Sequence, residues 1–104
     1  MTDMRSTTLR GAKLQKATLV RSSLAGTDAA GTDFSRMEAY RTNFTGIIAP
    51  GRNFTSAELQ RTDFISAELT NAVFGKAELG RADFESAVIG GAKFADELIV
   101  AMRS

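Results

Sequence analysis

The sequence predicts an all-β repeat protein, a β-solenoid with four sides per coil, and three periods support this prediction. Leu, Phe or Ile occupies every fifth position from 9 to 99, except at Ala29, Ala39 and Ala49. Glycine and arginine each recur at intervals of twenty residues. Repeats this regular determine the architecture before local propensities do. All seven phenylalanines lie on the five-residue grid, at intervals of ten: Phe34, Phe44, Phe54, Phe64, Phe74, Phe84 and Phe94.

Each five-residue unit is expected to form one side of a coil. A period of five fits neither an amphipathic helix nor a flat strand, whose apolar residues recur at 3.6 and 2. A small side chain recurs two residues before each grid position, as in Ala57-Glu58-Leu59 and Ala67-Glu68-Leu69. One large and one small inward residue cannot give a single coil a core, so the coils must stack to bury them.

The longer periods set the size of the coil. A coil of fifteen residues would stack Phe on Leu, whereas a coil of twenty stacks Phe on Phe, along two opposite sides. We therefore predict about five four-sided coils, with the phenylalanines and Leu59, Leu69 and Leu79 inside. Glycine with one asparagine forms a column typical of a corner with positive φ. This column is Gly11, Gly31, Gly51, Asn71 and Gly91.

The units resemble the consensus of the pentapeptide-repeat proteins, which is a small residue, Asp or Asn, Leu or Phe, and two polar residues. Ala82-Asp83-Phe84-Glu85-Ser86 and Thr62-Asp63-Phe64-Ile65-Ser66 match it closely, and the resemblance covers residues 7–94. It implies a right-handed quadrilateral β-helix. Length and composition predict a single domain over residues 1–104. The family includes the Qnr and MfpA type proteins, which protect or inhibit DNA gyrase by presenting a rod shaped and charged like duplex DNA. Family members differ in function.

Two places depart from the repeat within the predicted coils. Met37 and Ile47 enlarge the small inward position, while the next grid positions shrink to Ala39 and Ala49. This exchange predicts that the volume of each layer is conserved. In Pro50-Gly51-Arg52 an arginine occupies an inward position. Because burial of an unpaired guanidinium is very unfavourable, we expect either a local backbone distortion or a side chain that reaches the surface.

The segment 95–104 ends the repeat, because Glu97 replaces a small inward residue. Leu98, Ile99 and Met102 would share one face of a short helix with acidic residues near its start. Such a helix would cap the open end of the solenoid. The alternative is a homodimer contact through the same apolar residues at this end.

The composition argues against an enzyme. The chain has no His and no Cys, which removes histidine-dependent triads and the usual zinc ligands, so we predict no metal and no cofactor. Glu38, Glu58 and Glu78 have a spacing near that of retaining glycosidases, but a flat outer surface offers them no cleft. No apolar run approaches 18 residues, so we expect no membrane span and a cytoplasmic protein.

The most distinctive surface feature is a predicted arginine column at Arg21, Arg41, Arg61 and Arg81, beside Glu38, Glu58 and Glu78. It is either a solvated surface whose charges compensate one another or a strip that recognises a protein partner with a matching repeat. The formal charge of +1, with Tyr40 as the outward aromatic residue, argues against nucleic-acid binding. We therefore predict a non-enzymatic protein-interaction or scaffold module of unidentified partner. The alternative is a DNA-mimicking modulator of DNA gyrase.

Overall fold

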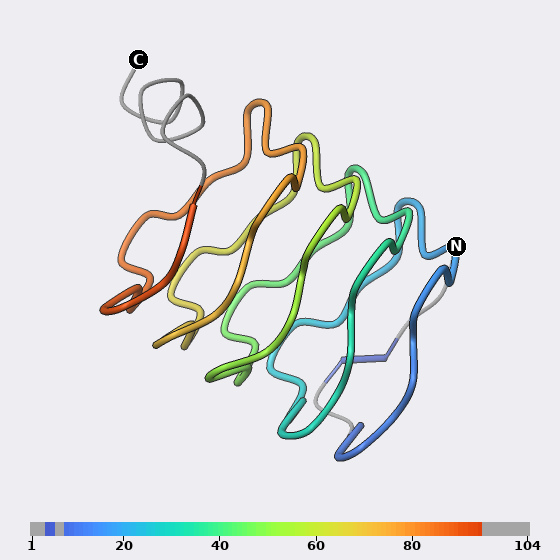
Figure 1. Cartoon of the computed structure of the whole chain (residues 1–104), viewed down its shortest axis with the longest axis horizontal. Coiled ribbons are helices and arrows are strands. Elements are labelled where there is room, and N and C mark those ends of the chain that lie inside the picture. The colour runs from blue at the N-terminus through green and yellow to red at the C-terminus, as the bar shows by residue number, and fades with distance from the viewer. Residues whose placement is uncertain (1–3, 6–7, 95–104) are drawn as a thin grey trace.

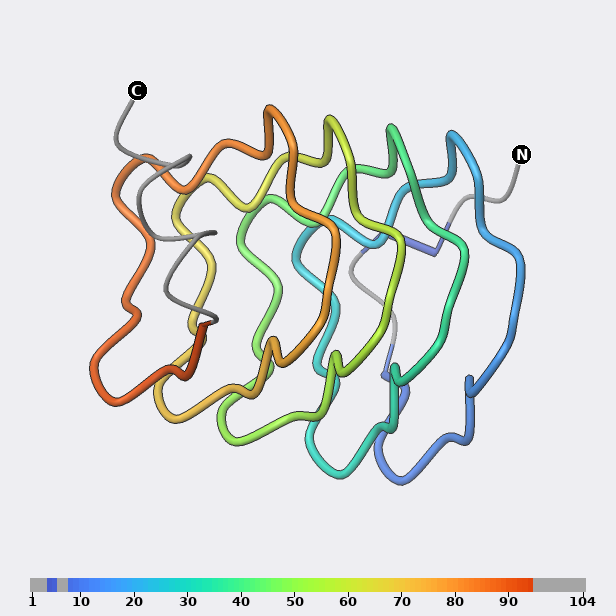
Figure 2. The same ribbon diagram turned by 45° about the horizontal axis from the view of Figure 1, so that its top comes forward.

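The computed structural model describes residues 4–5 and 8–94, and these residues wind through stacked coils (Figure 1). The β-bridges among these residues are isolated and parallel, and each joins residues twenty apart, from Thr8–Asp28 to Val73–Lys93. Bridges recur every five residues, so each coil has four sides, as predicted (Figure 2). The described residues contain no helix and no strand longer than a single bridge.

Every corner adopts a left-handed backbone conformation. The predicted glycine column has positive φ, as at Gly31 (76°), and Asn71 shares it (60°). The arginine corner adopts the same conformation, with φ of 57° at Arg21 and 59° at Arg41. The positive φ of these arginines was not predicted from the sequence, because a bulky residue rarely adopts positive φ. The stacked coils hold these corners in place: the Arg41 N–H, for example, donates to the Gln60 carbonyl at 2.9 Å.

The outward Asp and Asn residues stabilise the turns. Asp33 Oδ1 accepts a hydrogen bond from the Ser35 N–H at 2.9 Å, and Asn43 Oδ1 accepts one from the Thr45 N–H at the same distance. Short polar side chains readily bond to the backbone two residues on. This bond explains why Asp or Asn precedes the large residue of so many units.

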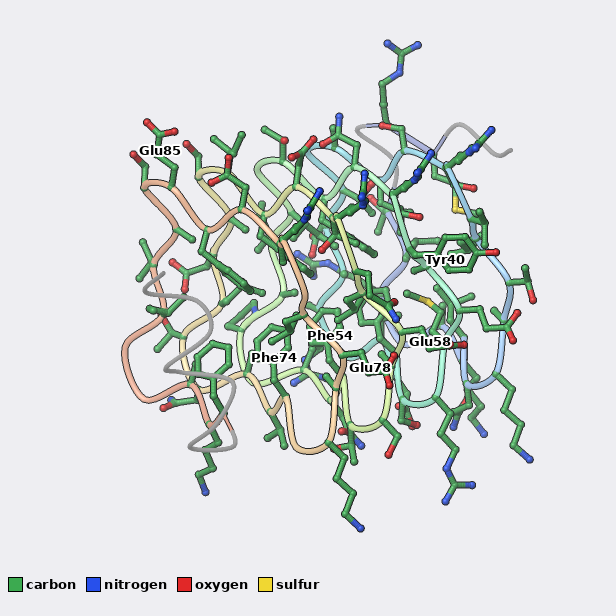
Figure 3. All side chains as sticks on the ribbon, turned by 90° about the horizontal axis from the view of Figure 1, so that it is seen from above. Tyr40, Phe54, Glu58, Phe74, Glu78 and Glu85 are labelled. Carbon is green, nitrogen blue, oxygen red and sulfur yellow. The ribbon has the colours of Figure 1, made fainter. Side chains whose placement is uncertain are left out.

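The phenylalanine rings fill the solenoid in two columns. Within a column the rings stack nearly parallel, as in Phe54–Phe74 at 4.8 Å and Phe44–Phe64 at 4.8 Å between ring centroids. The columns meet edge to face, as in Phe54–Phe64 at 5.8 Å and 88°. Both arrangements are favourable for aromatic pairs. Figure 3 shows Phe54 and Phe74 inside the coils. The predicted aromatic core is therefore confirmed, although Phe84 and Phe94 are only partly buried.

The remaining interior sides hold smaller residues. Leu59, Leu69 and Leu79 are buried, as predicted. Met37 and Ile47 are fully buried, and so are Ala39 and Ala49, at 0% exposure. The enlarged and reduced positions therefore lie in one close-packed interior, which agrees with conservation of layer volume.

Arg52 interrupts the repeat. Its side chain is partly buried, and Nε donates to the Pro50 carbonyl at 2.8 Å. Two backbone hydrogen bonds that form at equivalent positions between other described coils are missing here. They are the bond from the Gly31 N–H to the Pro50 carbonyl and the bond from the Asn53 N–H to the Thr32 carbonyl. Both outcomes expected for this segment thus occur together. The guanidinium leaves the core, and the bonding between coils opens beside it.

The cap or dimer contact predicted for Leu98, Ile99 and Met102 lies outside the described residues. Within the described part of the chain, no helix is long and apolar enough to cross a membrane.

Candidate interaction face

The arginine column lies along one corner of the solenoid and is exposed to solvent. Arg21, Arg41, Arg61 and Arg81 are all exposed. Their backbones stack directly, since the N–H of each of the first three donates to the carbonyl of the residue before the next arginine, as in Arg61 N–H to Gly80 O at 2.8 Å. The predicted alignment of these residues is therefore present in the fold.

The glutamate column lies on the side that ends at this corner. Glu38 bridges to Glu58, and Glu58 bridges to Glu78, so the three carboxylates rise at intervals of one coil. Glu38 Oε2 accepts a hydrogen bond from the Thr18 hydroxyl at 3.2 Å, and Glu78 accepts one from the Gln60 amide. We call this side the ladder face. It comprises Thr18, Glu38, Glu58 and Glu78, then Val20, Tyr40, Gln60 and Gly80, then the four corner arginines.

The two columns of the ladder face do not pair with each other. Among the described residues, none of the four corner arginines forms an ion pair within 4.0 Å, whereas Arg10 pairs with Asp28 at 2.7 Å. Three residues separate a glutamate from the arginine of its own coil, which amounts to ~10 Å between their backbones along an extended segment. The arginines therefore remain available to another molecule.

Carboxylates on the opposite side of the coil are satisfied locally. The hydrogen bond from Arg10, with one from the Ala30 N–H, lowers the pKa of Asp28 below its usual 3.8. Hydrogen bonds from the hydroxyl and N–H of Thr70 lower the pKa of Glu68 below its usual 4.5. These acids already have their partners, in contrast to the arginines of the ladder face.

A second basic corner borders the ladder face, and sequence reasoning missed it. Lys16, Arg36 and Lys76 are exposed at corners with φ of 63°, 58° and 58°, with Ser56 between the last two. The period of twenty could have revealed this corner, since these basic residues also recur at multiples of twenty. The glutamates thus form an acidic stripe with a basic stripe on each side.

Tyr40 lies within the ladder face and has 42% of its surface exposed. Together with Glu58, Gln60 and the neighbouring arginines it lines a shallow hollow, whose lining is Arg21, Tyr40, Arg41, Glu58, Gln60 and Arg61. Figure 3 shows Tyr40 beside Glu58, with Glu78 farther along the solenoid and Glu85 apart from all three. Tyr and Arg are among the residues enriched at protein–protein interfaces.

The chain belongs to the pentapeptide-repeat family. The family model for pentapeptide repeats (8 copies) matches residues 2–46, 40–75, 53–85 and 63–96, which together cover most of the sequence. This confirms the family predicted from the five-residue units. No protein with curated information matches the chain significantly.

Solved structures of three other proteins resemble this one. A pentapeptide repeat protein of the Arabidopsis thaliana thylakoid lumen has a TM-score of 0.61 and 24% identity, over 93% of this chain and 74% of that one. Trypsin-treated QnrB1, a plasmid-mediated fluoroquinolone resistance protein, has a TM-score of 0.68 and 17% identity, over 97% of this chain and 62% of that one. Rfr23, a pentapeptide repeat protein of the cyanobacterium Cyanothece 51142, has a TM-score of 0.54 and 15% identity, over 89% of this chain and 91% of that one. This chain thus spans less than two thirds of that QnrB1 chain. Such similarity supports a β-helix-like fold.

Proposed function

We propose that this chain is a non-enzymatic, cytoplasmic protein-interaction module and that its ladder face contacts a protein partner. The supporting observation is that four exposed arginines stand at intervals of one coil and, among the described residues, form no ion pair. Like charges this close repel each other, and an acidic partner would relieve the repulsion. The left-handed corners and the bonds between coils hold the column in place.

The spacing of the column favours a β-structured protein over nucleic acid. Stacked rings in this solenoid are 4.7 to 5.1 Å apart, which gives the interval between coils. Neighbouring strands of a β-sheet are ~4.7–4.9 Å apart, whereas one DNA strand advances ~3.4 Å per phosphate. An acidic ladder on a β-structured partner therefore stays in register with the arginines over several coils.

Reversal of three ladder arginines tests the proposal. We expect Arg41→Glu, Arg61→Glu and Arg81→Glu in one variant to reduce the partner retained by the immobilised chain at least ~10-fold, because each attraction becomes a repulsion. Retention from an extract of the source cell is quantified by mass spectrometry. The control variant has Lys16→Glu, Arg36→Glu and Lys76→Glu, which changes the net charge equally at the other corner. An equal loss of retention in both variants would show that net charge, and not the ladder face, governs binding.

Modulation of DNA gyrase is the second candidate. The similarity to trypsin-treated QnrB1, with a TM-score of 0.68 over 97% of this chain, favours it. The formal charge of +1 opposes it, because a mimic of duplex DNA has to be acidic.

A supercoiling assay separates the two candidates. If the first proposal is correct, we expect micromolar chain neither to inhibit purified gyrase nor to protect it from a fluoroquinolone. A change of at least ~2-fold in supercoiling, or in the fluoroquinolone concentration that halves it, would establish the second candidate instead. The triple arginine reversal serves as the control, since a DNA mimic should become more potent as it becomes more acidic.

A further inference from the structure

We propose that the partner of the ladder face is a second copy of this chain, docked side by side with the two solenoids parallel. This inference rests on the proposed function, because it requires the ladder face to bind protein. Its basis is that the face contains both halves of a complementary pattern. A glutamate column and an arginine column run along it at the same interval and, among the described residues, do not pair within one chain.

A twofold axis parallel to the solenoid axis brings the two patterns together. If this axis lies midway between the columns, the glutamates of one copy face the arginines of the other, and the reverse holds at the same time. Contacts of this kind are characteristic of twofold dimers. Both columns repeat once per coil, so Glu38 lies at the level of the partner's Arg41. The same register places Glu58 opposite the partner's Arg61, and Glu78 opposite the partner's Arg81.

The antiparallel arrangement lacks this complementarity. A twofold axis lying in the contact plane but perpendicular to the solenoid axis places each column opposite itself. Glutamates would then face glutamates and arginines would face arginines. Like charges directly opposite each other are destabilising. The charge pattern therefore selects the parallel dimer.

Tyr40 lies at the centre of this contact. Its column falls between the glutamates and the arginines, close to the proposed axis, and its ring is 42% exposed. Near the axis it meets the partner's Tyr40, with Val20 beside it in the same column. Aromatic residues at the centre of an interface, surrounded by polar contacts, contribute most of the binding energy.

The dimer is expected to be weak and sensitive to salt. The Cα trace extends over 32 × 24 × 22 Å, so one side of the solenoid offers at most the ~800 Å² per partner of a standard interface. Ion pairs at the edges of such a contact are screened beyond ~10 Å at 0.1 M salt. Association therefore needs to be measured at high protein concentration and low ionic strength.

A charge-swap experiment tests this arrangement. The first variant, Arg41→Glu with Arg61→Glu, has an acidic ladder face; the second, Glu38→Arg with Glu58→Arg, has a basic one. Sedimentation equilibrium at ~10 mM salt and up to ~500 µM protein should show dimers of the unaltered chain. Each variant alone should associate at least ~10-fold more weakly, and their equimolar mixture should recover a heterodimer. Thermal unfolding confirms that both variants are folded.

Two outcomes would overturn the inference: an unaltered chain that remains monomeric at ~500 µM, or a mixture that associates no better than the separate variants. Failure of the self-pairing can be distinguished from failure of the proposed protein binding. If the mixture stays monomeric while reversal of Arg41, Arg61 and Arg81 still abolishes retention of a cellular protein, the ladder face binds a different protein and only the self-pairing is wrong. Association through an end of the solenoid would persist in every variant, and it too would refute pairing through the ladder face.

Discussion

Phe64→Ala should lower the free energy of unfolding by about 3–5 kcal/mol. Phe64 is fully buried and stacks on Phe44 at 4.8 Å and on Phe84 at 5.1 Å. It also contacts Phe54 and Phe74 edge to face, at 5.8 Å and 5.9 Å. The hydrogen bonds between coils hold the surrounding backbone at a fixed interval, so the cavity left by the ring collapses little. Urea denaturation followed by circular dichroism measures the loss.

Two matched variants show whether the loss comes from the aromatic interior. Phe94→Ala should be less destabilising, because Phe94 is partly buried and contacts only Phe74 and Phe84 among the described rings. Ile48→Ala should change stability by less than about 0.5 kcal/mol, since Ile48 is 46% exposed. A loss below about 1 kcal/mol for Phe64→Ala would mean that its ring is not packed between its neighbours as described.

The aromatic interior of this fold was predictable from the sequence because one rule, like residues stacking on like, applies to the phenylalanines of the described coils. The period of twenty placed Phe54 over Phe34 and Phe74, and the structure stacks these rings. The corners were less predictable. Glycine indicated positive φ at one corner, but Arg21 and Arg61 adopt it as well, because the bonds between coils impose the turn whatever the side chain.

The ladder face was predicted only in part. Spacing alone aligned Arg41 with Arg61 and Glu38 with Glu58. Whether opposite charges meet depends on the directions that the long side chains take, which the spacing alone does not reveal. Among the described residues, the corner arginines form no ion pair within 4.0 Å with the glutamates. The position of Tyr40 between the glutamate and arginine columns becomes informative about binding only once it is known that the two columns do not pair.

Arg52→Thr should raise the free energy of unfolding by about 1–2 kcal/mol, since each regained hydrogen bond contributes about 0.5–1.5 kcal/mol. Arg52 Nε now occupies the Pro50 carbonyl, which should otherwise accept from the Gly31 N–H. Threonine fits the inward position, as Thr42 does, whose hydroxyl donates to the Leu19 carbonyl. The new hydroxyl would donate to the equivalent Ala29 carbonyl. The lost packing of the arginine methylenes offsets part of the gain.

Thermal and urea unfolding of this variant should be compared with Lys13→Thr, which makes a similar exchange at an exposed position. Lys13→Thr should stay within about 0.5 kcal/mol of the unaltered chain, because the site has no buried contacts to lose. Hydrogen exchange adds a local test, since the amides of Gly31 and Asn53 should become protected in Arg52→Thr alone. If both amides still exchange rapidly, the rigid φ of Pro50 holds the coils apart and the arginine merely occupies the gap.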